Sequence, residues 1–340
     1  ATAATSHMSE AGHALRLLDH EAVSRNADMD GLVTAIEAAF AAYARGEAQM
    51  PAKSYIDLPA YNGDFRSMPA YLRTEHWDAA GIKWVNVHPD NPASGTLPTV
   101  IGTMIYSDPA TGRPLAIMDG TTLTRLRTGA AAAVATDQLA VPEARSLGIV
   151  GAGAQSYTQL EAIATVRPIE EVVIADIDDA AVQAFHERYA DSYAVRAGTP
   201  AEAAQCDVLS TVTPVTEPIV ELAALGARTH VNAMGADAPG KQELATEVVT
   251  EATVFIDDYD QTTHSGEINV AWAAGVFEEA DIQGELGDVV VGTSPGRQPD
   301  DGVTVFDSTG LAIQDIAAAH VVYERAERTD SGQLFEMIGG

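Results

Sequence analysis

Two glycines in the middle of the chain have the spacing of a turn that can hold a phosphate. The apolar run Ser146–Val150 leads into Gly151 and Gly153, and a helix is expected from about Gln155 to Val166. Gly151 permits a tight turn, and Gly153 lets the backbone approach a pyrophosphate at the helix N-terminus. The third glycine of the usual pattern is Ser156 here. Strand, glycine turn and helix in this order predict a dinucleotide site.

A carboxylate follows this turn at the distance expected for a ribose ligand. The next apolar run, Glu171–Ala175, ends at Asp176, which is 23 residues after Gly153. A carboxylate here accepts hydrogen bonds from the ribose 2′-hydroxyl and repels a 2′-phosphate. The two motifs together predict NAD rather than NADP as the cofactor. The alternative is an ordinary glycine turn followed by a surface aspartate.

Positively charged residues gather before the glycine turn. Lysine is rare in the whole chain, which holds only Lys53, Lys83 and Lys241. The group of interest consists of Lys53, Arg66, Lys83, Arg125 and Arg127. Lysine and arginine bind small carboxylates well, so the group predicts an anionic ligand. For any single residue, an ion pair with one of the many acidic side chains is the alternative.

The composition excludes several classes of protein. With 49 Asp+Glu against 19 Lys+Arg the formal net charge is −30, while hydrophobic residues make up 46%. Such a chain can bury a core, unlike a disordered acidic tail. Its negative field repels nucleic acids and anionic membranes. An acidic, lysine-poor chain is typical of a salt-rich cytoplasm, where charge repulsion is screened.

The sequence also indicates location and metal content. A single cysteine, Cys206, excludes a disulfide framework and a cysteine-based zinc site. We expect no signal peptide and no membrane helix, hence a cytoplasmic protein, with Ser6–Met8 as a cloning scar and Met8 as the natural start. The histidines lack ligand spacing, and the acidic run Asp257–Asp260 is interpreted as a solvated face, so no metal is expected.

Apolar periodicity predicts the elements that position these residues. A helix is expected over about Asp19–Glu47 and an alanine-rich helix over about Thr122–Leu139. Between them, turns separate strand-like pieces at Lys53–Asp57, Ile82–Val87 and Thr99–Tyr106, and Pro114–Met118 closes this section. From Ser146 onward strands alternate with helices, which implies a parallel sheet covered on both faces. The expected strands are Ser146–Val150, Glu171–Ala175, Asp207–Val212, Thr229–Ala233 and Thr253–Ile256. A helix after Gly310 is expected to pack back on the first section.

This pattern predicts an α/β protein of two domains. A Rossmann-like doubly wound parallel sheet is the default for the alternating part, residues 121–311. An α+β domain is expected from residues 8–120 together with 312–340. With these boundaries Lys53, Arg66 and Lys83 would belong to the α+β domain, and Arg125, Arg127 and the glycine turn to the Rossmann-like domain.

Seven motifs occur in order along the chain. They are Met50–Lys53, Phe65–Tyr71, Gly81–Asn86, Leu97–Thr99, Asp119–Gly129, Asn232–Leu244 and Phe306–Asp315. Together they resemble the ornithine cyclodeaminase/μ-crystallin family, most closely its archaeal alanine dehydrogenase branch, and the resemblance extends from about Leu17 to Ala326. Ser156 in the glycine turn and an apparent extra residue in Ser94–Thr96 depart from the family pattern. All three lysines fall on positions that this family uses.

The resemblance implies a role for each matching residue. Lys53 and Arg66 would hold a substrate carboxylate, and Lys83 would lie near the reacting carbon. Arg127 would lie between the substrate and the cofactor, and Asp237 would be the catalytic acid/base. With the turn glycines included, the cofactor contacts would be Thr99, Arg127, Gly151, Gly153, Ala154, Gln155, Asp176, Thr213, Met234, Lys241 and Ser308.

Three activities remain open at this point. The first is NAD-dependent oxidation of L-alanine to pyruvate and ammonium, in which the Cα hydride passes to the nicotinamide. The second is cyclodeamination of ornithine to proline with catalytic NAD, or the related reduction of a cyclic imino acid such as pyrroline-2-carboxylate. The third is ligand binding without catalysis, as in the crystallin branch; retention of Asp237 opposes it. A homodimer formed through the α+β domain is implied for each.

Overall fold

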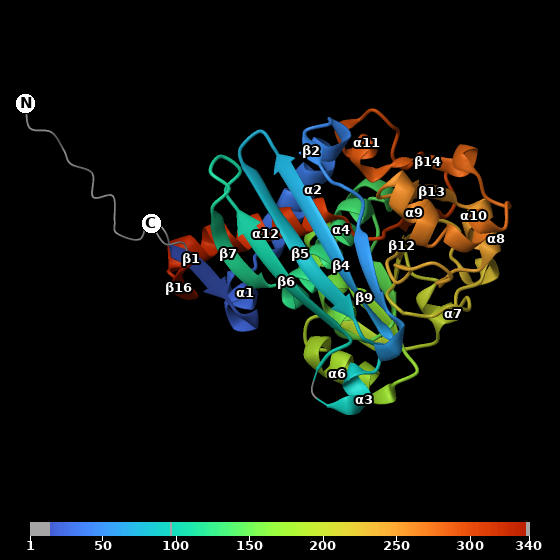
Figure 1. Cartoon of the computed structure of the whole chain (residues 1–340). Helices are drawn as coiled ribbons and strands as arrows, with labels where there is room; N and C mark the ends of the chain where they lie inside the picture. The colour runs from blue at the N-terminus through green and yellow to red at the C-terminus, as the bar shows by residue number, and fades with distance from the viewer. Residues whose placement is uncertain (1–13, 96, 338–340) are drawn as a thin grey trace, which may run out of the picture.

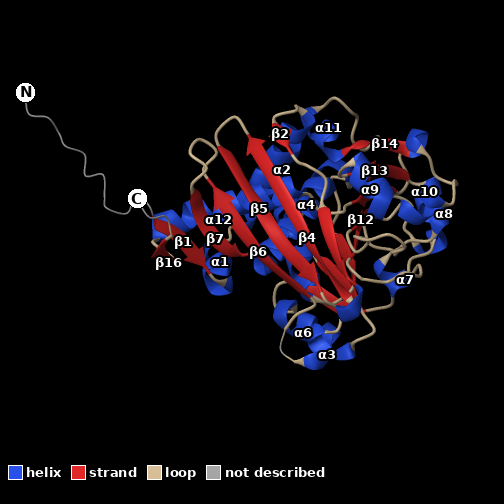
Figure 2. Ribbon diagram, viewed as in Figure 1, coloured by secondary structure: helices blue, strands red, loops and turns tan. Residues whose placement is uncertain are grey.

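Two eight-stranded sheets organise the chain (Figure 1). The computed structural model describes residues 14–95 and 97–337, so the expected scar Ser6–Met8 lies outside the described residues. The first sheet is mixed and is built mainly from the N-terminal third of the chain (Figure 2). Its strand order is β16 (Gln333–Glu336), β1 (Ala14–Leu18), β7 (Pro114–Asp119), β6 (Val100–Ser107), β5 (Asp78–Val87), β4 (Gly63–Arg73) and β2 (Ala48–Gln49), with β3 (Ser54–Leu58) paired to β4.

The second sheet confirms the predicted doubly wound topology. All its neighbouring strands pair in parallel. The order is β10 (Ala194–Ala197), β9 (Glu171–Ala175), β8 (Ser146–Val150), β11 (Val208–Thr211), β12 (His230–Ala233), β15 (Thr304–Asp307), β13 (Thr253–Ile256) and β14 (Ile282–Glu285). The chain leaves β8 toward β9 and β10 and later returns to β11 on the other side. The switch point where such folds bind ligands therefore lies between β8 and β11.

Strand β9 shows that both faces of the second sheet are covered. Val172 and Ile174 belong to one apolar cluster, together with Leu160 of α5 (Ala154–Val166). Val173 belongs to another, together with Val248 of α8 (Thr246–Glu251). Alternate residues of a strand point to opposite faces, so each face has its own packed layer. Continuous burial of this kind is typical of parallel sheets.

The helices of the described residues fill the space around and between the sheets. Helices α2, α4 and α12 pack on one face of the first sheet, and Figure 1 shows them behind its strands. Helix α4 also contacts α5 and β12 of the second sheet, so it lies between the two layers. The helices are α1 (His20–Asn26), α2 (Met29–Ala44), α3 (Asn91–Ser94), α4 (Gly120–Leu139), α5 (Ala154–Val166), α6 (Asp179–Tyr189), α7 (Pro200–Ala203), α8 (Thr246–Glu251), α9 (Tyr259–Ser265), α10 (Asn269–Ala273), α11 (Leu286–Val291) and α12 (Ala312–Thr329), with the 3₁₀ turns η1 (Pro59–Tyr61), η2 (Leu222–Ala224) and η3 (Glu279–Asp281).

The structure corrects one predicted helix and adds strands. The single helix expected over Asp19–Glu47 is two helices, α1 and α2, because Ala27 adopts an extended backbone conformation between them. Asn26 holds this break in place: its amide donates to the Ala22 carbonyl at 2.8 Å and accepts from Thr329 at 2.9 Å. Strands β1, β2, β4, β10, β14, β15 and β16 were not predicted. The predicted return of the C-terminal helix onto the first section is confirmed by its contacts with α2, β4 and β5.

Alternation along two paired strands places basic side chains on the inner face of the first sheet. Arg66 and Met68 of β4 are buried, and so are Lys83 and Val85 of β5. In the antiparallel register Arg66 lies opposite Val85, and Met68 lies opposite Lys83. The next residue of β5, Trp84, points outward and is 40% exposed. A shift of either strand by one residue in this register would turn the cation of that strand away from the site.

Candidate active site

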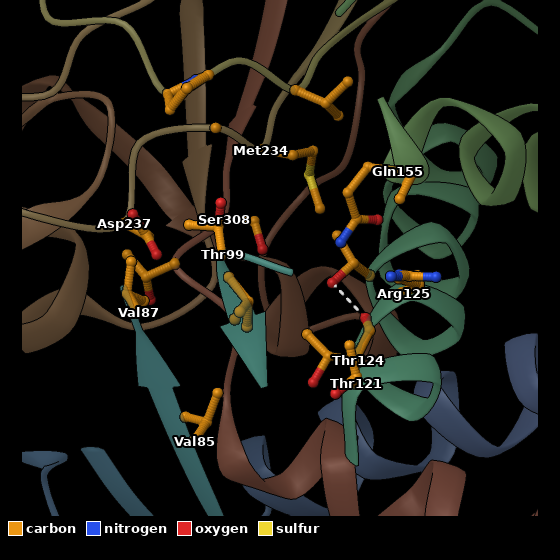
Figure 3. Close-up of a pocket in the computed structure, with 18 of the residues that line it drawn as sticks. Val85, Val87, Thr99, Thr121, Thr124, Arg125, Gln155, Met234, Asp237 and Ser308 are labelled. Atoms are coloured by element: carbon orange, nitrogen blue, oxygen red, sulfur yellow. Dashed lines mark hydrogen bonds between the residues drawn. The ribbon is translucent and has the colours of Figure 1, made fainter. Parts of the chain in front are cut away.

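A cavity of about 390 Å³ lies where the two sheets meet. The first sheet and the loop before it contribute Lys53, Arg66 and Lys83, and the second sheet contributes the loops that follow its strands. Figure 3 shows Asp237 on one side of this pocket and Gln155 with Arg125 on the other. The predicted positions from distant parts of the sequence are thus brought together.

The carboxyl ends of four neighbouring parallel strands line one wall of the pocket. Gly153 follows β8, Thr213 follows β11, Met234 follows β12 and Ser308 follows β15. Gly151 has φ of 107°, and a Cβ atom there would lie 3.0 Å from the Thr213 side chain, so only glycine fits this turn. At Gly153 a Cβ atom would meet nothing within 4 Å, which leaves the start of α5 open. An open helix N-terminus with free N–H groups suits a phosphate.

Most residues predicted to contact a cofactor line this pocket. They are Thr99, Arg127, Gly153, Ala154, Gln155, Thr213, Met234, Lys241 and Ser308. Gly151 and Asp176 are not part of the lining. The Asp176 carboxylate accepts hydrogen bonds from the Ala152 N–H at 2.6 Å and the Asp178 N–H at 2.9 Å. Asp176 therefore holds the glycine turn directly, at the carboxyl end of β9.

All three lysines of the chain line the same pocket, together with Arg66, Arg125 and Arg127. Among the described lining residues the only carboxylate is Asp237. In a chain with a net charge of −30 this is a strong local reversal of sign. Fixed positive charge in a concave site attracts small anions.

Asp237 lies between two of these cations. Its Oδ1 accepts from the Lys241 ammonium at 2.5 Å and its Oδ2 accepts from Arg66 Nη1 at 3.1 Å. Burial acts to raise the pKa of Asp237, but Lys241 and Arg66 outweigh it and hold the pKa below its usual range. Asp237 is therefore ionised at neutral pH and available as a proton acceptor.

Arg66 is held from behind by a second carboxylate. Its Nε and Nη2 donate to the two oxygens of Asp64, each at 3.0 Å. This bidentate pair fixes the plane of the guanidinium and leaves Nη1 directed at Asp237. Asp64 does not line the pocket, so it acts on the site through Arg66.

The remaining two lysines carry lowered pKa values. Lys53 donates to the Thr309 carbonyl at 3.0 Å, and burial lowers its pKa to about 8. Lys83 is 1% exposed, and burial lowers its pKa to about 7, against the opposing effect of Asp315. Desolvation disfavours the charged ammonium, and neighbouring cations add to the effect. Lys83 therefore titrates near neutral pH.

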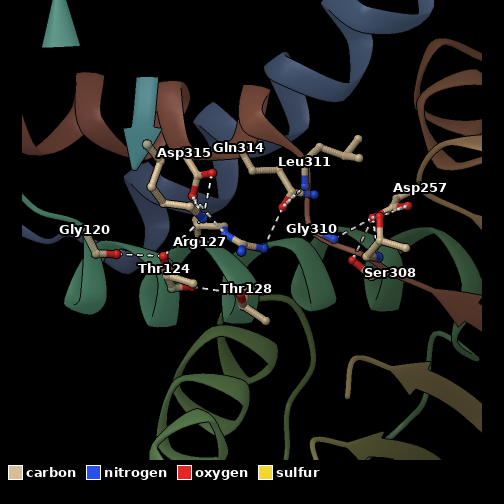
Figure 4. Close-up of polar contacts among 12 residues, drawn as sticks. Gly120, Thr124, Arg127, Thr128, Asp257, Ser308, Gly310, Leu311, Gln314 and Asp315 are labelled. Atoms are coloured by element: carbon tan, nitrogen blue, oxygen red, sulfur yellow. Dashed lines mark hydrogen bonds and ion pairs between the residues drawn. The ribbon is translucent and has the colours of Figure 1, made fainter. Parts of the chain in front are cut away.

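A buried acidic residue after β13 supports the loop between β15 and α12 (Figure 4). Asp257 accepts from the backbone N–H groups of Thr309 at 2.7 Å and Gly310 at 2.9 Å, and from the hydroxyl of Ser308 at 3.1 Å. It is 1% exposed, and burial raises its pKa. The interpretation of Asp257–Asp260 as a solvated face is therefore wrong for Asp257, because its donors come from a loop some fifty residues further along, and for Asp258, which is buried and accepts from the Tyr43 hydroxyl at 2.6 Å. Its place at the carboxyl end of a strand was the signal that could have revealed it.

Glu243 was also missed by sequence reasoning. One of its oxygens accepts from the N–H and the hydroxyl of Thr213, both at 2.6 Å, and the other accepts from the Gly235 N–H at 2.9 Å. It is fully buried, and burial raises its pKa. A single side chain thus ties together the loops after β11 and β12, both of which line the pocket.

Two further properties concern the described residues 14–95 and 97–337. Within them, no three His, Cys, Asp or Glu side chains are grouped so that they could hold a metal ion. Within the same ranges, none of the helices has the length and apolar character needed to cross a membrane.

The fold and site define a class of proteins in which a doubly wound parallel sheet and a mixed sheet share one cationic pocket. The model of the ornithine cyclodeaminase/mu-crystallin family matches residues 15–330, and the chain belongs to this family. Alanine dehydrogenase of Archaeoglobus fulgidus is 46% identical over 323 residues, covering 95% of this chain and 98% of that protein. A delta(1)-pyrroline-2-carboxylate reductase of Bacillus cereus is 35% identical over 268 residues, covering 77% and 82%. The structure of an archaeal alanine dehydrogenase dimer with bound NAD superposes with a TM-score of 0.91 at 44% identity, covering 96% of this chain and 100% of that one.

Proposed function

We propose that this chain is an NAD-dependent alanine dehydrogenase, which converts L-alanine, NAD and water into pyruvate, ammonium and NADH. The observation that carries the proposal is the pocket itself, where six cations and one carboxylate face the carboxyl ends of a parallel sheet. The 46% identity to the Archaeoglobus enzyme supports the choice of substrate.

The residues present fit NAD. The positive φ of Gly151 and the open space beside Gly153 leave the N-terminus of α5 accessible to a pyrophosphate. Asp176 offers carboxylate oxygens at the end of β9, where a ribose hydroxyl is bound in folds of this type. When bound, NAD accepts the hydride from the amino-acid Cα.

The chain's own residues supply orientation and proton transfer. We assign the substrate carboxylate to Lys53, Arg66 and Arg127, which converge on the pocket from a loop, a strand and a helix. A carboxylate held by several fixed donors presents Cα in one orientation, which removes an entropic part of the barrier. Asp237, ionised between its two cations, takes a proton from the water that adds to the iminium carbon and returns it to the departing amine.

The charges of the pocket favour a substrate with one amino group. Ornithine carries a second ammonium, which needs a carboxylate or several carbonyl acceptors once it leaves water. The only carboxylate among the described lining residues is Asp237, and both of its oxygens are already paired. Methyl-bearing side chains such as Met68, Val85 and Val87 line the remainder near the first sheet and suit a small apolar group. Reduction of a cyclic imino acid is the second candidate, supported by the Bacillus cereus relative.

A substrate panel tests the proposal. The protein is purified in concentrated KCl, and NADH absorbance is followed with pyruvate plus ammonium, and separately with pyrroline-2-carboxylate. Ornithine with catalytic NAD is assayed for proline in parallel. We expect the pyruvate reaction to have the highest kcat/KM. Proline from ornithine, without NADH oxidation by pyruvate and ammonium, would contradict it.

We further propose a homodimer, with the two sheets as separate domains at the predicted boundaries. Among the described residues, no helix covers the outer face of the first sheet (Figure 1). This face therefore exposes the side chains of Ile56, Trp84 and Ile105. An apolar surface of this kind is typical of a protein–protein interface. Light scattering of the wild type and of Trp84→Lys tests this: the wild type is expected as a dimer and the variant as a monomer. A monomeric wild type would contradict the proposal.

The charge supports the proposal of a protein adapted to a salt-rich cytoplasm. A net charge of −30 on 340 residues produces self-repulsion that salt screens. We expect the melting temperature to rise steadily from low to molar KCl. A melting temperature that is independent of KCl would contradict the adaptation but leave the enzyme assignment intact.

A further inference from the structure

One carboxylate behind the pocket serves two of its cations. Asp315, in the first turn of α12, is 0% exposed and does not line the pocket. The Lys83 ammonium donates to it at 2.9 Å. Arg127 Nε also donates to it, at 3.1 Å, and Figure 4 shows Arg127 beside Asp315. The sequence motif Phe306–Asp315 contains this residue, but no role was assigned to it.

Among the described residues, Asp315 is the only negatively charged partner of Lys83 and of Arg127. Arg127 has one more acceptor, the neutral Gln314 Oε1 at 3.0 Å, and Lys83 has the neutral Thr124 hydroxyl at 3.3 Å. Buried ionised groups need such a partner, because removing one member of a buried pair leaves a charge without compensation. The N-terminal end of the 18-residue helix α12 also favours a negative charge at this position.

We propose that Asp315 is a positioning residue that keeps Lys83 charged and fixes the guanidinium of Arg127, and that acts on substrate only through these two side chains. The proposal rests on the function proposed above for the kinetic part of its test. The role of Asp315 can be tested separately from the proposed function, because the charge state of Lys83 can be measured without any substrate.

The direction of the effect follows from the groups that face Lys83. Asp315 approaches from α12, Arg127 and Thr124 from α4, and Lys53 from the loop before β3. Burial, Arg127 and Lys53 lower the pKa of Lys83, while Asp315 raises it. Loss of Asp315 therefore moves the titration of Lys83 to lower pH, and loss of Arg127 moves it to higher pH.

The rarity of lysine makes this measurable. With lysine as the only isotopically labelled residue, the ¹³Cε spectrum contains three lysine environments, those of Lys53, Lys83 and Lys241. Replacement of each by arginine assigns the signals. In Asp315→Asn we expect the Lys83 midpoint to fall by about 1 to 3 pH units, the usual effect of an adjacent opposite charge. An unchanged or higher midpoint would overturn the proposal.

Two comparisons separate this role from a general loss of packing. Asp137→Asn removes another ion-paired carboxylate, one that holds Arg167 at 2.6 Å from α4 and does not line the pocket. It should leave the Lys83 midpoint in place; a fall equal to that in Asp315→Asn would overturn the proposal. Arg127→Gln should raise the Lys83 midpoint, and this second variant decides the matter if Asp315→Asn does not fold. A midpoint that stays or falls in Arg127→Gln would also refute the shared carboxylate.

Kinetics test whether Asp315 acts through its cations. Asp315→Asn should lower kcat/KM for the amino acid by on the order of a hundredfold, while the Kd for NADH stays within a few-fold. In a Lys83→Met, Arg127→Gln background the same substitution should change kcat/KM little, because the residues through which it acts are gone. A full additional loss in that background would contradict the positioning role. If the protein does not oxidise alanine but the titration midpoint of Lys83 shifts as expected, the proposed function is refuted and the positioning role of Asp315 still holds.

Discussion

Substitution of Asp237 by asparagine is the sharpest test of the proposed chemistry. The amide has nearly the same shape and its one oxygen can keep one of the two hydrogen bonds from Lys241 and Arg66, but it cannot take a proton from water. The carboxylate is otherwise ionised at neutral pH, since the two cations hold its pKa below the ordinary value of 3.8. General acid–base catalysis usually contributes about 10² to 10⁴ in rate, or roughly 3 to 5 kcal/mol of the barrier. We expect kcat to fall by that factor.

The assay separates chemistry from binding. NADH absorbance with saturating pyruvate and ammonium gives kcat, and quenching of protein fluorescence gives the Kd for NADH, which should be nearly unchanged. Asp64→Asn is the matched control, because Asp64 pairs with the same Arg66 but does not line the pocket. That variant should raise KM for the amino acid and change kcat by a few-fold at most. If Asp237→Asn retains kcat within tenfold of the wild type, Asp237 is not the acid/base.

Three further predictions follow from other parts of the structure. Asp176→Asn removes the charge that repels a 2′-phosphate but keeps an acceptor for the Ala152 N–H. The ratio of kcat/KM for NADPH to kcat/KM for NADH should therefore rise at least about tenfold. An unchanged ratio would count against the assignment of Asp176 to the ribose. Gly129→Ala places a Cβ atom 2.3 Å from the Thr158 carbonyl oxygen, where α4 crosses α5. Calorimetry should therefore show that the free energy of unfolding falls by about 1 to 3 kcal/mol. A melting temperature equal to or higher than that of the wild type would refute the close contact. Burial lowers the pKa of His230 to about 3, so its contribution to stability is complete above pH 6.5 and is lost as the pH falls toward 3. Denaturant unfolding of the wild type and His230→Asn should therefore differ most at pH 7 and converge at lower pH, and a difference that grows on acidification would contradict this sign.

The location of the dinucleotide turn and the type of sheet could be predicted from the sequence, because both depend on local properties. Gly151 is required by its own backbone angle, and the alternation of short apolar runs with helices specifies a parallel sheet. The basic residues could be recognised as a group, because cations are rare on so acidic a chain. Among the strands missed, β10 and β14 are short and gain their stability from neighbours rather than from their own composition, whereas the missed β4 is eleven residues long.

Only the tertiary structure decided which charges meet. Asp257 stands in an acidic run that looks solvated, and its donors in Ser308–Gly310 are close only after β13 and β15 pair. Asp315 becomes the partner of Lys83 and Arg127 only when α12 returns to the first sheet and packs beside α4. Burial and partnership of a charge depend on residues far away in the chain, so no local pattern records them. The sequence by itself determined the cofactor turn and the small group of cations before it, and the packing of the two sheets determined which of those cations share a carboxylate.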